Sequence, residues 1–295
     1  MLVLGGGPAG TWAAVSAAGR GARVVLADKG FCGTSGSTAA AGTGVWYVDP
    51  DPAQREAAMA GREKLGGYLQ DRRWMARTLD LTYQQSNRLA DWGYPYPIDD
   101  HGRSQRNSLQ GPEYMRLMRK RTKQAGVTIL DHSPALELLL DGRAVAGASG
   151  LRRQKGDGWT VRAKAVVIAT GGCAFLSKTL GSNVLTGDGY LMAAEAGAEF
   201  SSMEFSNPYA ISPAFGSVTK TLFYGWATFT YDDGSVVPGA ASKDRRSRAR
   251  FSRARYMPDS TRPTQTCSGT CASRSRTFSC PSIAPASTRS PIAFR

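Results

Sequence analysis

The sequence predicts an α/β fold that is built on a parallel sheet and carries a small antiparallel meander. A short apolar run at residues 1–4 leads through a glycine-rich turn into an alanine-rich helix at 11–20. A second apolar run at 22–27 follows, as in a strand–helix–strand unit. Two further apolar runs, 135–140 and 144–151, flank an Asp-Gly pair, which is a hairpin signal.

The first turn has the pattern of a dinucleotide-binding fingerprint. Gly5 permits a tight turn, Gly7 lets a pyrophosphate approach the backbone, and Gly10 allows the helix to pack closely on the strand. The helix N-terminus offers free N–H groups and a positive dipole end. Asp28, after the second strand, is placed to accept hydrogen bonds from ribose hydroxyls. The alternative is a structural turn that binds nothing. The candidate residues of the turn are Gly5, Gly7, Pro8, Ala9 and Gly10.

A second loop, residues 29–44, is rich in glycine and hydroxyl groups and can wrap around a ligand. A nicotinamide dinucleotide does not need this loop, whereas a flavin dinucleotide extends past the ribose and does. The alternative is a flexible surface loop. The candidate ligand residues here are Lys29, Thr34, Ser35, Ser37, Thr38, Gly42 and Gly44.

Three helices are predicted next, at residues 51–64, 71–92 and 111–124. The first two are expected to pack in the core, the second through Trp74, Leu81, Leu89 and Trp92. The third carries Arg116, Arg119, Lys120, Arg121 and Lys123, which we interpret as a solvated face because no aromatic residues interleave with them.

Strands are predicted at 127–131, at 159–162 and at 165–172. The last of these ends in the small residues Ala169, Thr170, Gly171 and Gly172, which again allow a ligand to approach the backbone closely. A helix follows from 186 to 197. Asp188 near its start caps the helix or contacts a ligand. Residues 201–205 resemble a strand, and 214–239 could form strands with a turn at 232–234.

The net charge of +14 comes mostly from the C-terminal segment 243–295, which holds twelve Lys and Arg and two acids. The body therefore keeps 25 of the 37 basic and 21 of the 23 acidic residues, so nucleic acid is an unexpected partner. No apolar stretch is long enough for a bilayer span, and no signal peptide is recognised. With only Cys32 and Cys173 in the body, we expect a cytoplasmic protein and no metal site.

Taken together, these motifs resemble the succinate dehydrogenase/fumarate reductase flavoprotein family, which includes L-aspartate oxidase and the adenylylsulfate reductase alpha subunit. The resemblance covers about residues 1–210. It implies a Rossmann-like FAD-binding domain, an α+β capping domain, and hydride transfer at flavin N5, with a possible electron-transfer partner subunit. It also implies that Asp28 holds the adenosine ribose, that the backbone of Ala135 meets the adenine, and that Asp188 helps to hold the cofactor. The motifs that carry it are residues 5–10, 28–29, 37–42, 169–172, 186–189, 196–198 and 203–205.

Three departures from the family refine these expectations. Ser37 and Thr38 stand where covalent flavoproteins carry a histidine, so FAD is predicted to be non-covalent. Tyr209 stands where dicarboxylate enzymes have a substrate histidine, so the substrate is unknown. No segment matches the chain's return to the FAD domain with its catalytic arginine, so no catalytic residue is assigned. An inactive truncated FAD-binding remnant and an NAD(P)-binding protein are the alternatives.

The predicted domains are an FAD-binding domain at 1–205, the start of the cap at 206–242, and a basic tail at 243–295. The tail contains no Leu or Val and is rich in Arg, Ser, Pro and Thr, so it cannot bury a core. We interpret it as disordered or as the product of a frameshift. Two alternatives are a nucleic-acid-binding arm and metal binding by Cys267, Cys271 and Cys280, whose spacing lacks the usual zinc pattern.

Overall fold

The computed structural model describes residues 1–177, 179–203, 228–231, 265–270 and 277–279. The chain divides into two compact units, 1–177 with 181–199, and 178–180 with 200–295. In the second unit, β10 (Thr228–Tyr231), β11 (Gln265–Thr270) and β12 (Thr277–Ser279) form an antiparallel sheet.

The strand predicted at Ser201–Phe205 is wrong in its described part, because residues 201–203 form no strand. Tyr209 and most of the predicted cap lie outside the described residues.

The centre of the first unit is a four-stranded parallel sheet with the order β5-β2-β1-β9. Its strands are β1 (Leu2–Leu4), β2 (Val25–Ala27), β5 (Thr128–Leu130) and β9 (Val166–Ile168). Leu2 lies opposite both Val25 and Val166, so β1 is an inner strand. All three residues of β1 are buried, as the continuous apolar run predicts for a strand covered on both faces.

Helices α1 (Pro8–Ala18) and α5 (Gly111–Gln124) pack against each other. Trp12 on α1 donates a hydrogen bond from Nε1 to the Tyr114 hydroxyl on α5 at 2.7 Å. Short segments complete this side of the unit: α2 (Gly36–Ala39) contacts α5, and β3 (Gly42–Gly44) pairs with β4 (Ser108–Gln110). The predicted glycine-rich loop therefore contains a short helix and a short strand.

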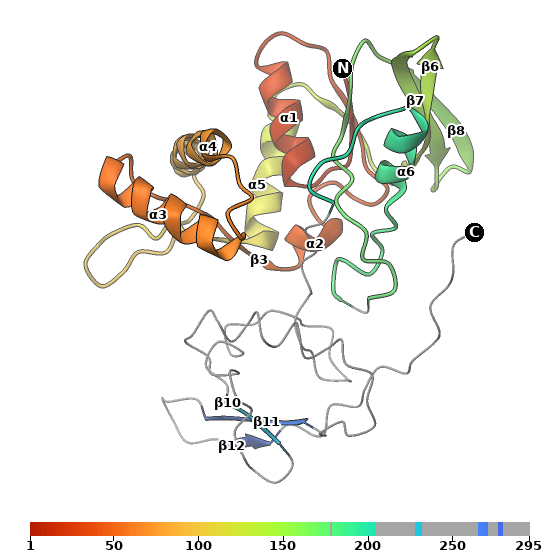
Figure 1. Cartoon of the computed structure of the whole chain (residues 1–295). Coiled ribbons are helices and arrows are strands. Elements are labelled where there is room, and N and C mark those ends of the chain that lie inside the picture. Colours follow the sequence, from red (N-terminus) through yellow and green to blue (C-terminus); the bar gives the residue numbers. More distant parts are fainter. Residues whose placement is uncertain (178, 204–227, 232–264, 271–276, 280–295) are drawn as a thin grey trace. The chain divides into compact units, whose positions relative to one another are not determined.

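The predicted meander is confirmed as an antiparallel sheet of β6 (Ala135–Asp141), β7 (Ala144–Arg152) and β8 (Asp157–Arg162) (Figure 1). Ala148 and Trp159 from the meander join Leu2 and Leu4 of the parallel sheet in one buried cluster. Met192 of α6 (Asp188–Glu195) belongs to the same cluster. The meander and the central sheet therefore share a core.

The packing of helices α3 (Pro52–Leu65) and α4 (Arg72–Asp91) differs from the prediction. Helix α3 buries none of its residues, so the prediction that it packs in the core is wrong. Helix α4 does pack in the core, but through Met75, Leu79, Ser86 and Leu89, whose spacing places them on one face. Trp74 and Leu81 lie off this face and are 63% and 46% exposed, so their predicted core role is wrong.

Candidate dinucleotide-binding site

The loops that follow the four parallel strands meet at one edge of the sheet. Because β1, β2, β5 and β9 all run in the same direction, their carboxyl ends lie together. Gly5 follows β1, Asp28 follows β2, Asp131 follows β5, and Ala169 follows β9. In open α/β sheets this edge is where ligands bind. It holds the two motifs that the sequence singled out, the glycine turn and the acid after the second strand.

The three glycines of the turn have the geometry that their predicted tasks require. Gly5 has φ +106°, and an added Cβ there would overlap the carbonyl group of Ala169. An added Cβ at Gly10 would overlap the carbonyl oxygen of Gly5. A Cβ at Gly7, by contrast, would have no atom within 4 Å. Gly5 and Gly10 thus fix the turn, and the space in front of Gly7 is open.

Helix α1 begins directly at this open space. Its N-cap is Gly7, no side chain caps it, and Pro8 occupies the first position. The first turn contains no acidic residue, so nothing in it opposes an anion at the positive end of the helix dipole. Pro8, Ala9 and Gly10 form that first turn. Such a terminus suits a phosphate group.

Asp28 is almost fully buried, at 4% exposure, and connects the turn to the second loop. Its Oδ2 accepts a hydrogen bond from the backbone N–H of Gly6 at 2.6 Å. Its Oδ1 accepts from the N–H of Gly30 at 2.7 Å and from the Ser35 hydroxyl at 2.8 Å. A carboxylate has about four acceptor positions. Three are used within the protein, which leaves about one for a ribose hydroxyl.

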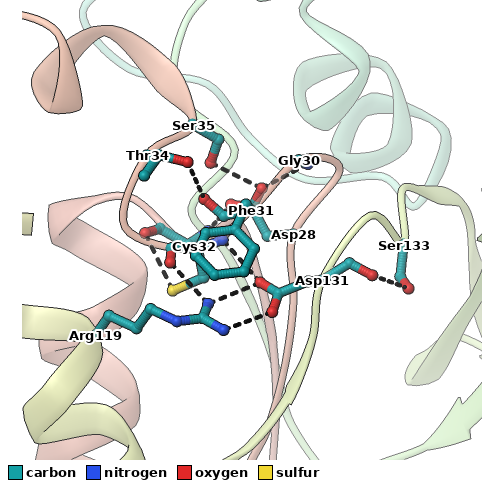
Figure 2. A network of polar contacts seen from close by, with 10 residues as sticks. Asp28, Gly30, Phe31, Cys32, Thr34, Ser35, Arg119, Asp131 and Ser133 are labelled. Carbon is teal, nitrogen blue, oxygen red and sulfur yellow. Dashed lines mark hydrogen bonds and ion pairs between the residues drawn. The ribbon is translucent and has the colours of Figure 1, made fainter. Parts of the chain in front are cut away.

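An ion pair lies beside this network, at the end of β5 (Figure 2). Arg119 on α5 donates two hydrogen bonds to Asp131, at 2.8 and 2.7 Å, and a third to the carbonyl oxygen of Cys32 at 2.7 Å. Asp131 also accepts from the N–H of Cys32 at 2.8 Å. The guanidinium group lies 3.8 Å from the centre of the Phe31 ring. The prediction that Arg119 belongs to a solvated face is therefore wrong.

The pair and the thiol beside it have shifted pKa values. Burial acts to raise the pKa of Asp131, but the hydrogen bonds from Arg119 and Cys32 and the charge of Arg119 outweigh it, and the pKa is lowered. Burial raises the pKa of the Cys32 thiol to about 12, and the Asp28 carboxylate adds to this rise. Asp131 therefore stays ionised and Cys32 stays protonated at neutral pH.

A third contact ties the second loop to the segment before α6. Lys29 donates from Nζ to the carbonyl oxygen of Val184 and, at 3.5 Å, to the Thr186 hydroxyl. The Thr186 hydroxyl in turn bonds the carboxylate of Asp188. Asp188 is the first residue of α6, whose N-cap is Gly187. The structure thus brings together Lys29 and Asp188, two predicted site residues that are distant in the sequence.

The other predicted site residues divide into two groups. Ala169 and Thr170 lie directly against Gly5, and Ala135 packs beside the cluster that contains Leu2 and Leu4. The second group lies further along the loop. Ser37 shares a hydrogen bond with Ser182, the carbonyl of Thr38 lies against Gly111, and Gly42 and Gly44 are on β3, paired with β4. Thr34 is exposed, and its hydroxyl donates to the carbonyl of Phe31. Gly171, also exposed, has φ +79°.

Four residues of this region were not predicted as site residues: Cys32, Arg119, Asp131 and Ser133. Asp131 directly follows a strand of the parallel sheet just as Asp28 does, and that shared position was the available signal. Ser133 donates its N–H to the carbonyl of Asp28 at 2.7 Å. Nothing in the local sequence distinguishes Arg119 from its basic neighbours on α5. In the described part of the chain, no group of His, Cys, Asp and Glu side chains is arranged to hold a metal ion.

The parallel sheet, the glycine turn and the acid at the end of β2 define a dinucleotide-binding α/β protein. The chain belongs to the FAD dependent oxidoreductase family, whose model matches residues 1–247. FAD is the cofactor of this family, and the resemblance stated from the motifs is confirmed.

Curated relatives agree with this assignment. L-aspartate oxidase of Halobacterium salinarum is 31% identical over 231 residues, which cover 70% of this chain and 44% of the relative. The fumarate reductase flavoprotein subunit of Mycobacterium tuberculosis is 26% identical over 226 residues, covering 70% of this chain and 38% of the relative. The chain therefore spans about two fifths of the length of these relatives.

Solved structures share the fold. A variant of E. coli quinol fumarate reductase superposes with a TM-score of 0.75 at 20% identity, over 93% of this chain and 54% of that one. Adenylylsulfate reductase from Archaeoglobus fulgidus gives a TM-score of 0.57 at 24% identity, over 66% of this chain and 35% of that one. In the described part of this chain, no helix combines the length and the apolar character needed to cross a bilayer.

Proposed function

We propose that this chain binds FAD non-covalently at the carboxyl edge of its parallel sheet and forms the cofactor-binding part of an oxidoreductase. The observation that carries the proposal is the open space at Gly7, in front of the uncapped N-terminus of α1. Bound FAD supplies hydride transfer at flavin N5. The residues described here would bind and orient its adenine dinucleotide half.

The site fits that half of the cofactor in three respects. The backbone at Gly7 is accessible to a pyrophosphate, and the helix dipole favours its charge. Asp28 has about one acceptor position left for a ribose hydroxyl. Thr170, which lies against Gly5, continues the same edge of the sheet on the side of β9. Non-covalent binding is supported by Ser37 and Thr38, neither of which provides the nitrogen nucleophile of a histidyl–flavin bond.

For the substrate of the reaction, only a chemical class is proposed. The relatives include proteins named L-aspartate oxidase and fumarate reductase, and on that basis an organic acid is the substrate class to screen first. Tyr209 at the expected substrate histidine argues against an unaltered dicarboxylate site. Relatives named as subunits support an electron-transfer partner. The free cysteines Cys32 and Cys173 support a reducing compartment such as the cytoplasm.

The test is the visible absorption spectrum of the purified, desalted protein, before and after incubation with FAD. We expect an oxidised-flavin spectrum, and acid precipitation should release all of the flavin. A protein that stays colourless after incubation with FAD would contradict the proposal. Flavin that stays on the acid-precipitated protein would contradict non-covalent binding.

A pair of matched variants locates the site. Gly7→Val adds a side chain where the protein itself leaves room, so the fold is retained with a loss of about 1 kcal/mol at the N-cap. FAD binding should be lost, because the new side chain occupies the space of the pyrophosphate. Gly61→Val adds the same side chain at an exposed position of α3 and should bind FAD normally. Equal binding by both variants would place the cofactor elsewhere.

A further inference from the structure

The ion pair between Arg119 and Asp131 holds both polar backbone groups of one loop residue. Arg119 donates to the carbonyl oxygen of Cys32 at 2.7 Å, and Asp131 accepts from its N–H at 2.8 Å. The two side chains also hold each other through two hydrogen bonds in a parallel fork. The Cys32 backbone is therefore fixed between α5 and the end of β5.

Cys32 in turn contacts the glycine turn. Its Sγ donates to the carbonyl oxygen of Gly6 at 3.6 Å, and its side chain is fully buried. An added Cβ at Gly6 would lie 2.8 Å from Cys32 Cβ and 2.6 Å from Asp28 Oδ2. The Gly6 residue is thus held by Asp28 at its N–H and by Cys32 at its carbonyl group. Gly7, the open position, is the next residue.

The Arg119 side chain is held in place by contacts within the protein and is largely shielded from solvent. Its side chain is 15% exposed and that of Asp131 is 21% exposed. One face of the guanidinium group covers Phe31, the residue before Cys32. Gly33, the residue after Cys32, has φ +103° and lies against the Arg119 side chain and the carbonyl of Met115. Arg119 therefore contacts three consecutive residues of the loop.

We propose that Arg119 and Asp131 are positioning residues for the cofactor, which set the conformation of the phosphate-binding turn through Cys32. The inference rests on the proposed function. A guanidinium fork is required, because an ammonium group cannot bond two carboxylate oxygens and a carbonyl in one plane. The pair stays charged at neutral pH, since each partner's pKa is shifted towards its charged form.

The test is FAD affinity, measured by quenching of flavin fluorescence, in Arg119→Gln and Asp131→Asn. Each variant should weaken binding at least tenfold under conditions where its urea unfolding curve shows a fully folded protein. Arg119→Lys should fall between Arg119→Gln and the wild type, because it restores the charge without the fork. Arg152→Gln breaks a bidentate pair of the same kind, with Asp157 on the exposed meander, and should bind FAD as the wild type does.

A spectroscopic readout separates positioning from stability. The ³¹P resonances of bound FAD report the surroundings of its pyrophosphate, and they should shift in Arg119→Gln but not in Arg152→Gln. Unchanged affinity and unchanged resonances in folded Arg119→Gln and Asp131→Asn would overturn the inference. Failure of the wild-type chain itself to bind FAD would overturn the proposed function instead, so the two failures are distinguishable.

Discussion

The Asp28 carboxylate accepts a hydrogen bond from the backbone N–H of Gly6 at 2.6 Å, across 22 residues of sequence. The contact joins the loop after β2 to the turn after β1. It is buried, so it is made in a surrounding of low polarity where an unpaired N–H is costly. The acid of the dinucleotide-binding fingerprint therefore has a task within the protein as well as its expected task toward a ribose.

We expect Asp28→Asn to lower the free energy of unfolding by about 2 kcal/mol. Asn has the same shape, but only one of its two terminal atoms can accept. With its oxygen towards Gly30, its NH2 group faces the N–H of Gly6, and two donors then meet. Urea unfolding of the flavin-free protein measures the loss, and FAD affinity should fall with it.

Ser35→Ala is the control, because it removes one donor and leaves both backbone contacts of Asp28 in place. Its loss should be nearer 1 kcal/mol. If Ser35→Ala destabilises the protein as much as Asp28→Asn does, the hydrogen bond from Gly6 to Asp28 contributes no more to stability than the one from Ser35.

Gly10→Ala should destabilise the protein by about 1–3 kcal/mol, the usual effect of overpacking. The new methyl group meets the backbone oxygen of Gly5, which cannot move aside without shifting β1 or α1. Gly61→Ala, in the exposed helix α3, should instead stabilise it by up to about 1 kcal/mol through helix propensity. Thermal unfolding of both variants gives the sign directly, and a stable Gly10→Ala protein would rule out close packing of α1 on β1.

The sheet and the glycine turn could be predicted because their signals are local. The apolar run that became β1 is continuous, as expected for a strand buried on both faces. The run that became β9 also predicted a strand, although Val166 and Val167 are half-buried and Ile168 is exposed. The turn needs glycine for reasons that lie within a few residues or in the neighbouring strand. An Asp-Gly turn between two apolar runs likewise predicted the antiparallel meander.

The role of Arg119 could not be predicted in this way. Its partners, Asp131 and Cys32, are 12 and 87 residues away, and only the completed sheet brings them together. Trp74 shows the opposite error: an aromatic residue on an amphipathic helix suggests the core, yet it lies beside the face formed by Met75 and Leu79. A shift of one residue on a helix is a rotation of about 100°, which is enough to exchange core for solvent.

Leu79 and Trp74 allow a direct test of that corrected packing. Leu79 is fully buried, so Leu79→Ala should lower the free energy of unfolding by about 2–5 kcal/mol. Trp74 is exposed and its ring contacts Arg77, so Trp74→Ala should change the stability by no more than about 1 kcal/mol. Urea unfolding of the two variants should give this order. The reverse order would mean that α4 is rotated from the arrangement described here.

The pH dependence of stability should contain a contribution from Cys32. Burial raises its pKa from the ordinary 9.0 to about 12 in the folded protein. Between these values the folded state keeps a proton that the unfolded state has lost, so the free energy of unfolding falls as pH rises. The contribution is fully present below pH 9 and declines by up to about 1.4 kcal/mol per pH unit above it.

Cys32→Ala isolates this contribution from other alkaline titrations, such as that of Tyr96, whose pKa is also raised to about 12 by burial. The substitution removes the thiol and leaves Tyr96 unchanged. Urea unfolding at pH 8.5 and pH 10 should therefore show a smaller loss of stability in Cys32→Ala than in the wild type. Because Tyr96 affects both proteins equally, the difference between the two losses belongs to Cys32. Equal losses would mean that the thiol beside Gly6 ionises freely, which is incompatible with its packing against the glycine turn.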